Sequence, residues 1–195
     1  MKKNYHSKRA AISALLAFSL ATVAGKALSE TIAEQRAEIQ KMRVTTLERL
    51  YKVHPAARAD VQKAAGYAVF SNVGINLILL SAAGGSGVAH DNRSGKDVYM
   101  KMLSGGFGIG LGVKDFRGVF VFSSTEKLNQ FTNSGWEASA QADAAAKAGN
   151  KGGAAAGAIT VAPGVNLYQL TENGLALQAT IQGTKYFKND ELNGK

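Results

Sequence analysis

The residues able to carry out catalytic chemistry are few and scattered in this sequence. Beyond the first 30 residues it has two histidines, His54 before a proline and His90 beside Asp91. Neighbouring side chains of a strand point to opposite faces, so His90 and Asp91 would not share a site on a strand. No pair of histidines has the spacing of metal ligands, and no cysteine offers a thiolate. We therefore predict a protein that is not an enzyme and that holds no metal and no cofactor.

Five glycines between residues 105 and 113 resemble a nucleotide-binding loop in composition only. Their spacing fits neither G-x-G-x-x-G nor a loop that ends in G-K-[ST]. They alternate with apolar residues, which predicts a strand with one face free of side chains. A bare strand face allows close packing of another element, a sharp bend of the sheet, or an elongated apolar ligand. The residues of such an apolar slot would be Gly106, Gly108, Gly110 and Gly112.

Basic residues near the ends of predicted strands are the candidates for binding lipid headgroups. Two of them bracket a strand predicted at residues 97–102, and two follow the glycine-rich strand. Each Lys or Arg near an anionic membrane surface contributes about 1 kcal/mol of attraction. Ordinary solvated turn residues would give the same pattern, and that alternative stays open. The candidates are Arg93, Lys96, Lys101, Lys114 and Arg117.

The first 29 residues predict a secretory signal peptide. A basic start, residues 1–9, precedes an apolar stretch at residues 10–24, and small residues follow. Cleavage is expected after Ser29, with Ala27 and Ala24 as alternative positions. The apolar stretch is short for a membrane span, although an uncleaved anchor is the alternative to cleavage. Since there is no cysteine for lipidation, we expect a soluble or peripheral protein of the periplasm or cell envelope.

The net charge outside the predicted signal peptide is modest. The whole sequence carries +9, from 23 Lys and Arg against 14 Asp and Glu. Five of the basic residues and none of the acids lie in the first 29, so 18 basic and 14 acidic residues leave about +4. Domains that bind nucleic acid are usually more basic and cluster their charges, so we expect no nucleic-acid partner. Weak attraction to an anionic membrane surface fits this charge, and so does an ordinary solvated exterior.

Two blocks of predicted elements position these residues. Residues 30–52 contain strong helix formers and neither glycine nor proline, which predicts a long helix. A second helix is predicted at residues 55–65, since proline suits a first turn and Gly66 a stop. From residue 67 onwards apolar and polar residues alternate, which predicts strands. We expect strands at 67–70, 73–80, 97–102, 105–113, 119–122, 136–144, 159–170 and 175–182, a hairpin turn at Asn173-Gly174, and short helices at 125–133 and in the last residues, 185–195.

The predicted fold class is α+β. An N-terminal helical arm, residues 30–66, would pack on a Gly-rich antiparallel sheet of residues 67–195, either open or closed into a barrel. A low-complexity stretch of Gly, Ala and Lys at residues 147–157 predicts a loop within that sheet region. The arm and the sheet together, residues 30–195, would form one domain behind the signal peptide, residues 1–29.

Four short stretches carry a resemblance to a known family. They are Ala-Gly-Tyr-Ala-Val-Phe at 65–70, Gly-Gly-Ser-Gly-Val at 84–88, Gly-Gly-Phe-Gly-Ile-Gly-Leu-Gly-Val at 105–113 and Val-Phe-Val-Phe at 119–122. Their order and spacing resemble the SYLF domain family over roughly residues 35–190. One departure is Ser71, where the family usually has a proline after the Tyr-Ala-Val-Phe stretch.

The resemblance implies a lipid-binding domain without catalytic residues. Members of the SYLF family bind phospholipids, eukaryotic members bind phosphoinositides, and some yeast members also bind actin filaments. Bacterial members are typically exported proteins of the cell envelope. In eukaryotic members the lipid contacts are attributed to an amphipathic N-terminal segment and basic residues, which correspond loosely to residues 30–63 here.

We therefore expect a non-catalytic module of the bacterial cell envelope that binds phospholipid or an anionic membrane surface. The first alternative is an envelope structural or protein-interaction module that holds a protein partner on the same sheet and binds no lipid. A small outer-membrane barrel is a second alternative, and an enzyme is a third. Uneven predicted strands and an aromatic content of 8% argue against that barrel, and the scattered catalytic residue types argue against an enzyme.

Overall fold

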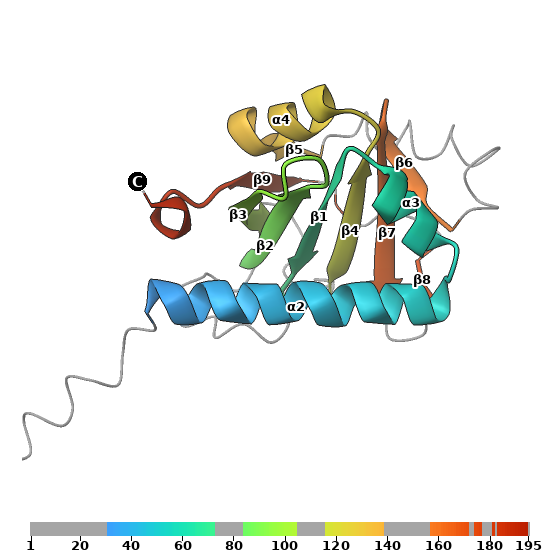
Figure 1. Cartoon of the computed structure of the whole chain (residues 1–195), viewed down its shortest axis with the longest axis horizontal. Coiled ribbons are helices and arrows are strands. Elements are labelled where there is room, and N and C mark those ends of the chain that lie inside the picture. The colour runs from blue at the N-terminus through green and yellow to red at the C-terminus, as the bar shows by residue number, and fades with distance from the viewer. Residues whose placement is uncertain are drawn as a thin grey trace, which may run out of the picture.

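The computed structural model describes residues 31–72, 84–104, 116–138, 157–171, 174–176, 181 and 183–194 of the chain. Within these residues the fold is α+β, as predicted. A curled antiparallel sheet of nine strands has helices on both of its faces (Figure 1). The long N-terminal helix runs across one face of this sheet, so the predicted packing of a helical arm on a sheet is confirmed.

The N-terminal arm consists of two helices separated by a proline. α2 (Ile32–Val53) begins with a capping box, in which the Thr31 hydroxyl accepts a hydrogen bond from the Glu34 amide and the Glu34 carboxylate accepts one from the Thr31 amide. The helix ends before Pro55, and α3 (Ala57–Lys63) follows. Both predicted helices of the arm are confirmed, with ends that differ from the prediction by at most two residues.

The sheet joins segments from almost the whole described chain. Its strands are β1 (Gly66–Ser71), β2 (Gly84–Asp91), β3 (Asp97–Ser104), β4 (Arg117–Phe122), β5 (Trp136–Glu137), β6 (Ile159–Ala162), β7 (Val165–Thr171), β8 (Gly174–Leu175) and β9 (Thr184–Lys188). They follow the order β5-β9-β3-β2-β1-β4-β7-β6, and β8 pairs with β7. The strands predicted at 67–70, 97–102 and 119–122 are confirmed as β1, β3 and β4. The predicted hairpin is confirmed as the antiparallel pair β7–β8, although Gly174 is a strand residue paired with Thr171 and not part of the turn.

At three places the structure differs from the sequence prediction. The segment predicted as one strand, 159–170, is two strands, because Pro163 and Gly164 form a turn with a φ of 76° at the glycine. A strand that the sequence did not indicate, β2, forms at 84–91, where Gly87 leaves the room that the Phe70 ring of β1 occupies. The last residues contain a short helix as expected, but it is confined to the 3-10 turn Glu191–Asn193, and Thr184–Lys188 before it is strand β9.

Several predicted elements lie outside the described residues. They include the strands at 73–80 and 105–113 and all but the last residue of the loop at 147–157. Of the strand predicted at 136–144, β5 and Ala138 are described, and residues 139–144 lie outside. Of the strand predicted at 175–182, residues 177–180 and 182 lie outside.

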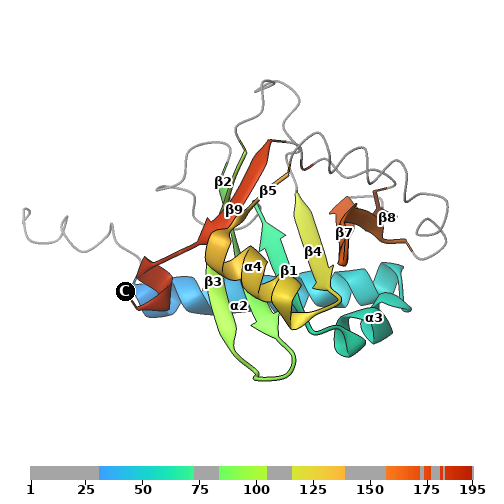
Figure 2. The ribbon, with the colours of Figure 1, turned by 90° about the horizontal axis from the view of Figure 1, so that it is seen from above.

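The centre of the sheet is covered on both faces. Along β1, Tyr67 and Val69 point to the face of α2 and α3, whereas Ala68 and Phe70 point to the opposite face. All six residues of β1 and five of the six of β4 are buried. A view from above shows α4 (Thr125–Ser134), the confirmed helix of the 125–133 prediction, lying over the sheet with α2 behind it (Figure 2).

The α4 side of the sheet holds a cluster of aromatic rings. Phe131 of α4 lies with its ring centroid 6.0 Å from that of Phe70 and 5.5 Å from that of Phe120. Tyr186 of β9 packs against the same two phenylalanines, with centroid distances of 4.8 and 5.0 Å. Its hydroxyl is buried and has no hydrogen-bond partner among the described residues, and burial raises the pKa of this phenol. The ring therefore stabilises the core while its hydroxyl opposes folding.

α2 is held to the sheet by a polar cluster around Asp97, the first residue of β3. The Asp97 carboxylate accepts hydrogen bonds from Gln40 at 2.8 Å and from Arg43 at 3.0 Å, both on α2. His90 of β2 places its Nδ1 atom 2.6 Å from the same carboxylate. These four residues form the Asp97 cluster, which joins α2 to β2 and β3. His90 and Asp91 do not share a site, as predicted.

Removing the Asp97 carboxylate should loosen α2. Asp97→Ala leaves Arg43 and His90 partly buried without their acceptor, so we expect the free energy of unfolding to fall by about 2 kcal/mol. Urea denaturation followed by circular dichroism measures the change. Asp190→Ala is the matched control, because that carboxylate is exposed and makes no capping hydrogen bond. An equal loss in both variants would contradict the role assigned to the Asp97 cluster.

Two buried tyrosines give opposite expectations for the same substitution. Tyr186→Phe removes an unpaired hydroxyl, so the free energy of unfolding should rise by about 1 kcal/mol. Tyr168→Phe removes a hydroxyl that donates to Asp60 at 2.5 Å. The free energy of unfolding of this variant should therefore fall by about 1 kcal/mol. Chemical denaturation of both variants beside the unmodified chain is the measurement. A loss of stability in Tyr186→Phe would mean that its hydroxyl has a partner after all.

Candidate functional site

Four side chains of β3 and β9 lie together on one face of the sheet. Along β3, Met102 points into the α4-side core, so Lys101 and Leu103 point to the opposite face. The antiparallel register pairs Lys101 with Phe187 and Leu103 with Lys185. The two apolar residues thus occupy one diagonal of a small rectangle and the two lysines the other. We call these four residues the β3–β9 patch.

The apolar members of the β3–β9 patch are open to solvent. Leu103 is 40% exposed and Phe187 is 41% exposed, which makes them two of the five exposed large hydrophobic residues in the described part of the chain. Diagonal neighbours across an antiparallel pair lie roughly 7–8 Å apart, within reach of an aromatic ring. At the edge of the patch, Lys185 pairs with Glu137 of β5 at 3.3 Å. The patch therefore combines apolar surface with positive charge.

The structure places two of the sequence candidates in one row across the sheet. Lys101 pairs with Ser86, Ser86 with Ser71, and Ser71 with Arg117, so Lys101 and Arg117 share a face. Strands lie about 4.8 Å apart, so the Cα atoms of these two residues are roughly 14 Å apart. The serine hydroxyls between them are buried. Ser71, the departure from the SYLF pattern, is therefore an integral residue of β1.

The other two described candidates lie at the opposite end of the strands. Arg93 and Lys96 belong to the turn between β2 and β3, in which the Asp91 carboxylate accepts hydrogen bonds from the amides of Arg93 and Ser94. Lys96 lies five residues from Lys101, or roughly 17 Å along an extended strand. Both turn cations are exposed. The structure does not bring them together with Lys101 and Arg117, and the solvated-turn alternative fits them.

The remaining predicted site residues lie outside the described part of the chain. They are Lys114 and the apolar-slot candidates Gly106, Gly108, Gly110 and Gly112. Conversely, sequence reasoning missed Leu103, Lys185, Phe187 and Glu137. For Lys185 and Phe187 the local signal was the presence of Thr184, Tyr186 and Phe187, residue types that favour strands.

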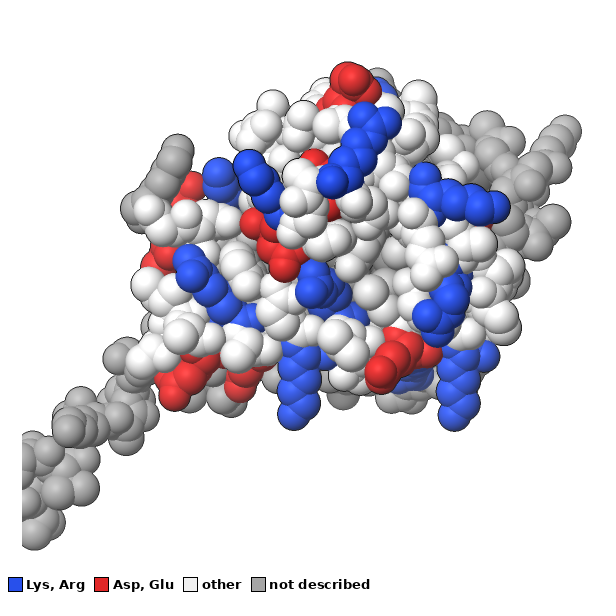
Figure 3. Space-filling view, viewed as in Figure 1, with Lys and Arg blue, Asp and Glu red and all other residues white. Residues whose placement is uncertain are grey.

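Cations and acids are interspersed along α2, which lies along the lower side of the molecule in the view of Figure 3. α2 and α3 together carry seven Lys and Arg against four Asp and Glu. Three of the arginines are engaged within the protein, since Arg36 and Arg49 donate to backbone carbonyls and Arg43 to Asp97. Lys41 and Lys52 are exposed. Acids interrupt the cations along both helices, so these helices present no continuous basic stripe.

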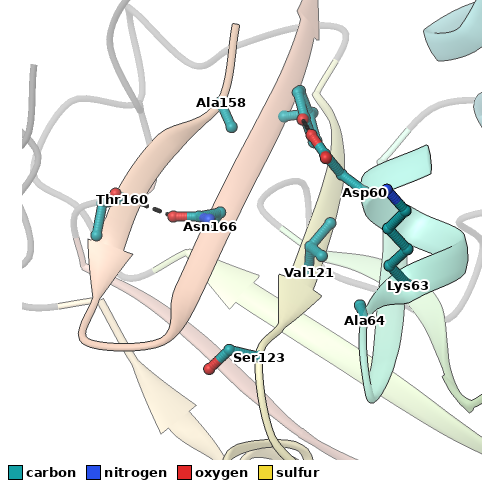
Figure 4. A pocket seen from close by; sticks show the side chains of 9 residues that line it. Asp60, Lys63, Ala64, Val121, Ser123, Ala158, Thr160 and Asn166 are labelled. Atoms are coloured by element: carbon teal, nitrogen blue, oxygen red, sulfur yellow. Dashed lines mark hydrogen bonds between the residues drawn. The ribbon is translucent and has the colours of Figure 1, made fainter. Parts of the chain in front are cut away.

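A pocket of about 410 Å³, lined by both polar and apolar side chains, lies between α3 and strands β4, β6 and β7, and we call it the α3–β7 pocket (Figure 4). Asp60 and Lys63 line it from α3, while Thr160 and Asn166 line it from β6 and β7. Tyr168 donates to Asp60 beside the pocket. Burial, and then the hydrogen bond and the charge of Asp60, raise the pKa of this phenol, so it stays protonated and remains a donor.

Among the described residues, no three His, Cys, Asp or Glu side chains come together as metal ligands. None of the helices in the described ranges is long and apolar enough to cross a lipid bilayer. The polar groups that do converge are those of the pocket and the Asp97 cluster, and the apolar surface with lysines is the β3–β9 patch.

Comparison with known proteins finds a named relative. No family model matches the chain. Beta cell expansion factor A from Aeromonas veronii is 35% identical over 165 residues, which cover 84% of this chain and 60% of the relative. The chain thus spans about three fifths of the length of that relative, and its likeness extends over most of the segment described above.

Proposed function

We propose that this chain is a non-catalytic module of the bacterial cell envelope, exported by its N-terminal signal peptide, that binds phospholipid through the β3–β9 patch. The observation that carries the proposal is the exposed pair Leu103 and Phe187 interleaved with Lys101 and Lys185. The resemblance to the SYLF family supports a lipid ligand. The name of the relative refers to beta cell expansion and to no ligand or reaction, so the proposal rests on the patch.

Lipid binding would use both kinds of side chain in the β3–β9 patch. Leu103 and Phe187 would enter the boundary between headgroups and acyl chains, while the lysine ammonium groups reach lipid phosphates. Full burial of such an apolar side chain contributes about 1.5–3 kcal/mol, so a side chain already more than half buried gains roughly 1 kcal/mol. Each lysine adds about 1 kcal/mol. The sum of these apolar and lysine contributions is of the size expected for reversible binding to a membrane surface.

The alternative function is an envelope structural or protein-interaction module without a lipid ligand. It would place a protein partner on the same apolar and basic side chains. The two functions differ in what they require of the membrane. Lipid binding depends on anionic headgroups and weakens with salt, because the lysine contribution is screened beyond a Debye length of about 8 Å at physiological ionic strength. A protein partner requires no anionic lipid.

Vesicle binding tests the proposal. The purified chain should sediment with vesicles of phosphatidylglycerol and phosphatidylethanolamine and much less with vesicles of phosphatidylcholine alone. The double variant Leu103→Ser, Phe187→Ser should lower the partition constant roughly tenfold or more, through the lost apolar contact. Lys101→Glu should also weaken binding, and less so at high salt.

The double variant Ile32→Ser, Val44→Ser is the matched control for vesicle binding. These α2 side chains are 43% and 49% exposed, similar to the apolar members of the patch. Binding should survive in this control, and circular dichroism should show all variants folded. Failure of the unmodified chain to bind anionic vesicles, or equal losses in both double variants, would refute lipid binding through the β3–β9 patch.

Removing the charge of Glu137 should strengthen vesicle binding, whereas the substitutions in the patch weaken it. The Glu137 carboxylate lies 3.3 Å from the Lys185 ammonium and competes with lipid phosphate for that cation. Glu137→Gln should therefore strengthen sedimentation with anionic vesicles about two- to fivefold, since it adds roughly 0.5–1 kcal/mol of net attraction. Glu191→Gln, at another exposed acid, is the charge-matched control. The same increase in both variants would show that net charge alone drives the binding.

A further inference from the structure

The α3–β7 pocket lies at the opposite edge of the sheet from the β3–β9 patch. In the strand order, β9 and β3 lie next to the β5 edge, whereas β7 and β6 form the other edge. A ligand in the pocket would therefore not touch the patch. The pocket volume of about 410 Å³ falls within the range of small-molecule sites, which is roughly 300–1,000 Å³. Its lining comes from one helix and three strands, so the fold determines its shape.

Hydrogen bonds within the lining orient its polar groups. The Thr160 hydroxyl donates to the Asn166 side-chain oxygen at 2.9 Å, which leaves the Asn166 amide nitrogen as the donor available to a ligand (Figure 4). The Tyr168 hydroxyl donates to one Asp60 oxygen, and the other Asp60 oxygen accepts no hydrogen bond from the described residues. The pocket thus offers an oriented donor on its strand side and an acceptor on its helix side.

The charges of the lining cancel. Asp60 and Lys63 are its one acid and one base, and both come from α3. A phosphate would meet the carboxylate of Asp60, and an ammonium ligand would meet the cation of Lys63, so neither ion is favoured. An apolar ligand would leave the oriented Asn166 amide and the Ser123 hydroxyl without partners, at a cost in binding free energy. The lining therefore selects a neutral ligand that both donates and accepts hydrogen bonds.

We propose that this pocket binds a hydroxyl-rich neutral ligand, a saccharide unit. Each sugar hydroxyl is a donor and an acceptor at once, so neighbouring hydroxyls can accept from Asn166 and Lys63 and donate to Asp60. The C–H face of a sugar ring suits the apolar part of the lining, which includes Val121 and Ala158. The inference is independent of the proposed phospholipid binding, because the two sites lie at opposite edges of the sheet.

Titration of the purified chain by ¹H–¹⁵N NMR tests the saccharide site. The probes are glucose and N-acetylglucosamine, with sodium phosphate as an anionic comparison and glycine as a zwitterionic one. We expect the sugars to shift the amide resonances of the lining residues, and the charged probes to shift them much less. Asn166→Ala removes the oriented donor and should raise the dissociation constant roughly tenfold, the effect of one lost hydrogen bond.

Controls separate this site from the fold and from lipid binding. Asn129→Ala, at an exposed asparagine of α4, should leave sugar binding unchanged. Asn166→Ala should still bind anionic vesicles. The saccharide proposal and the lipid proposal can therefore fail independently of each other. The saccharide site is refuted if neither sugar shifts the lining resonances, if the shifts map elsewhere, or if phosphate or glycine shifts them more strongly than the sugars do.

Discussion

Strands β1 and β4 bury side chains on both of their faces, and the arrangement of the helices follows from the need to cover them. A single helix cannot shield two faces of a sheet, so α2 and α3 pack against the face of Tyr67 and Val69, and α4 packs against the face of Ala68 and Phe70. Both helix layers lie over the centre of the sheet. The edges are less covered, and there the β3–β9 patch and the α3–β7 pocket occur, one at each edge. Both candidate sites thus follow from the same two-sided core.

The attachment of α2 combines apolar packing with directional hydrogen bonds. Ile39 and Leu50 are buried, and Met42, Leu47 and Tyr51 pack against the same core clusters. Apolar contacts have no preferred direction, whereas hydrogen bonds do. The Asp97 cluster and the bonds from Arg36 and Arg49 to backbone carbonyls therefore help to set the rotation of the helix. The Arg43 and Asp97 side chains are 20% and 24% exposed, so the ion pair avoids the large desolvation cost of full burial.

The β3–β9 patch differs in kind from a basic turn. Turn cations such as Arg93 and Lys96 offer charge on a short solvated segment, and salt screens that charge. In the patch, strand pairing sets the spacing of two lysines and two apolar side chains before any ligand arrives. A preordered surface loses less conformational entropy on binding than a mobile one. The proposed lipid contact therefore draws on the rigidity of the sheet as well as on its composition.

Local patterns determined the fold class, the helices and the alternating strands, because capping, proline breaks and periodicity act within a few residues. The capping box of Thr31 and Glu34 and the continuous apolar runs of β1 and β4 are of this kind. Tertiary structure alone decided that glycine-rich β2 is a strand, since the Phe70 ring of a neighbouring strand compensates for the missing side chain of Gly87. It also decided the site: Lys101 and Phe187 are far apart in the chain and meet only because β9 pairs with β3. The sequence could identify Lys101 as a candidate, but pairing between distant segments selected its neighbours.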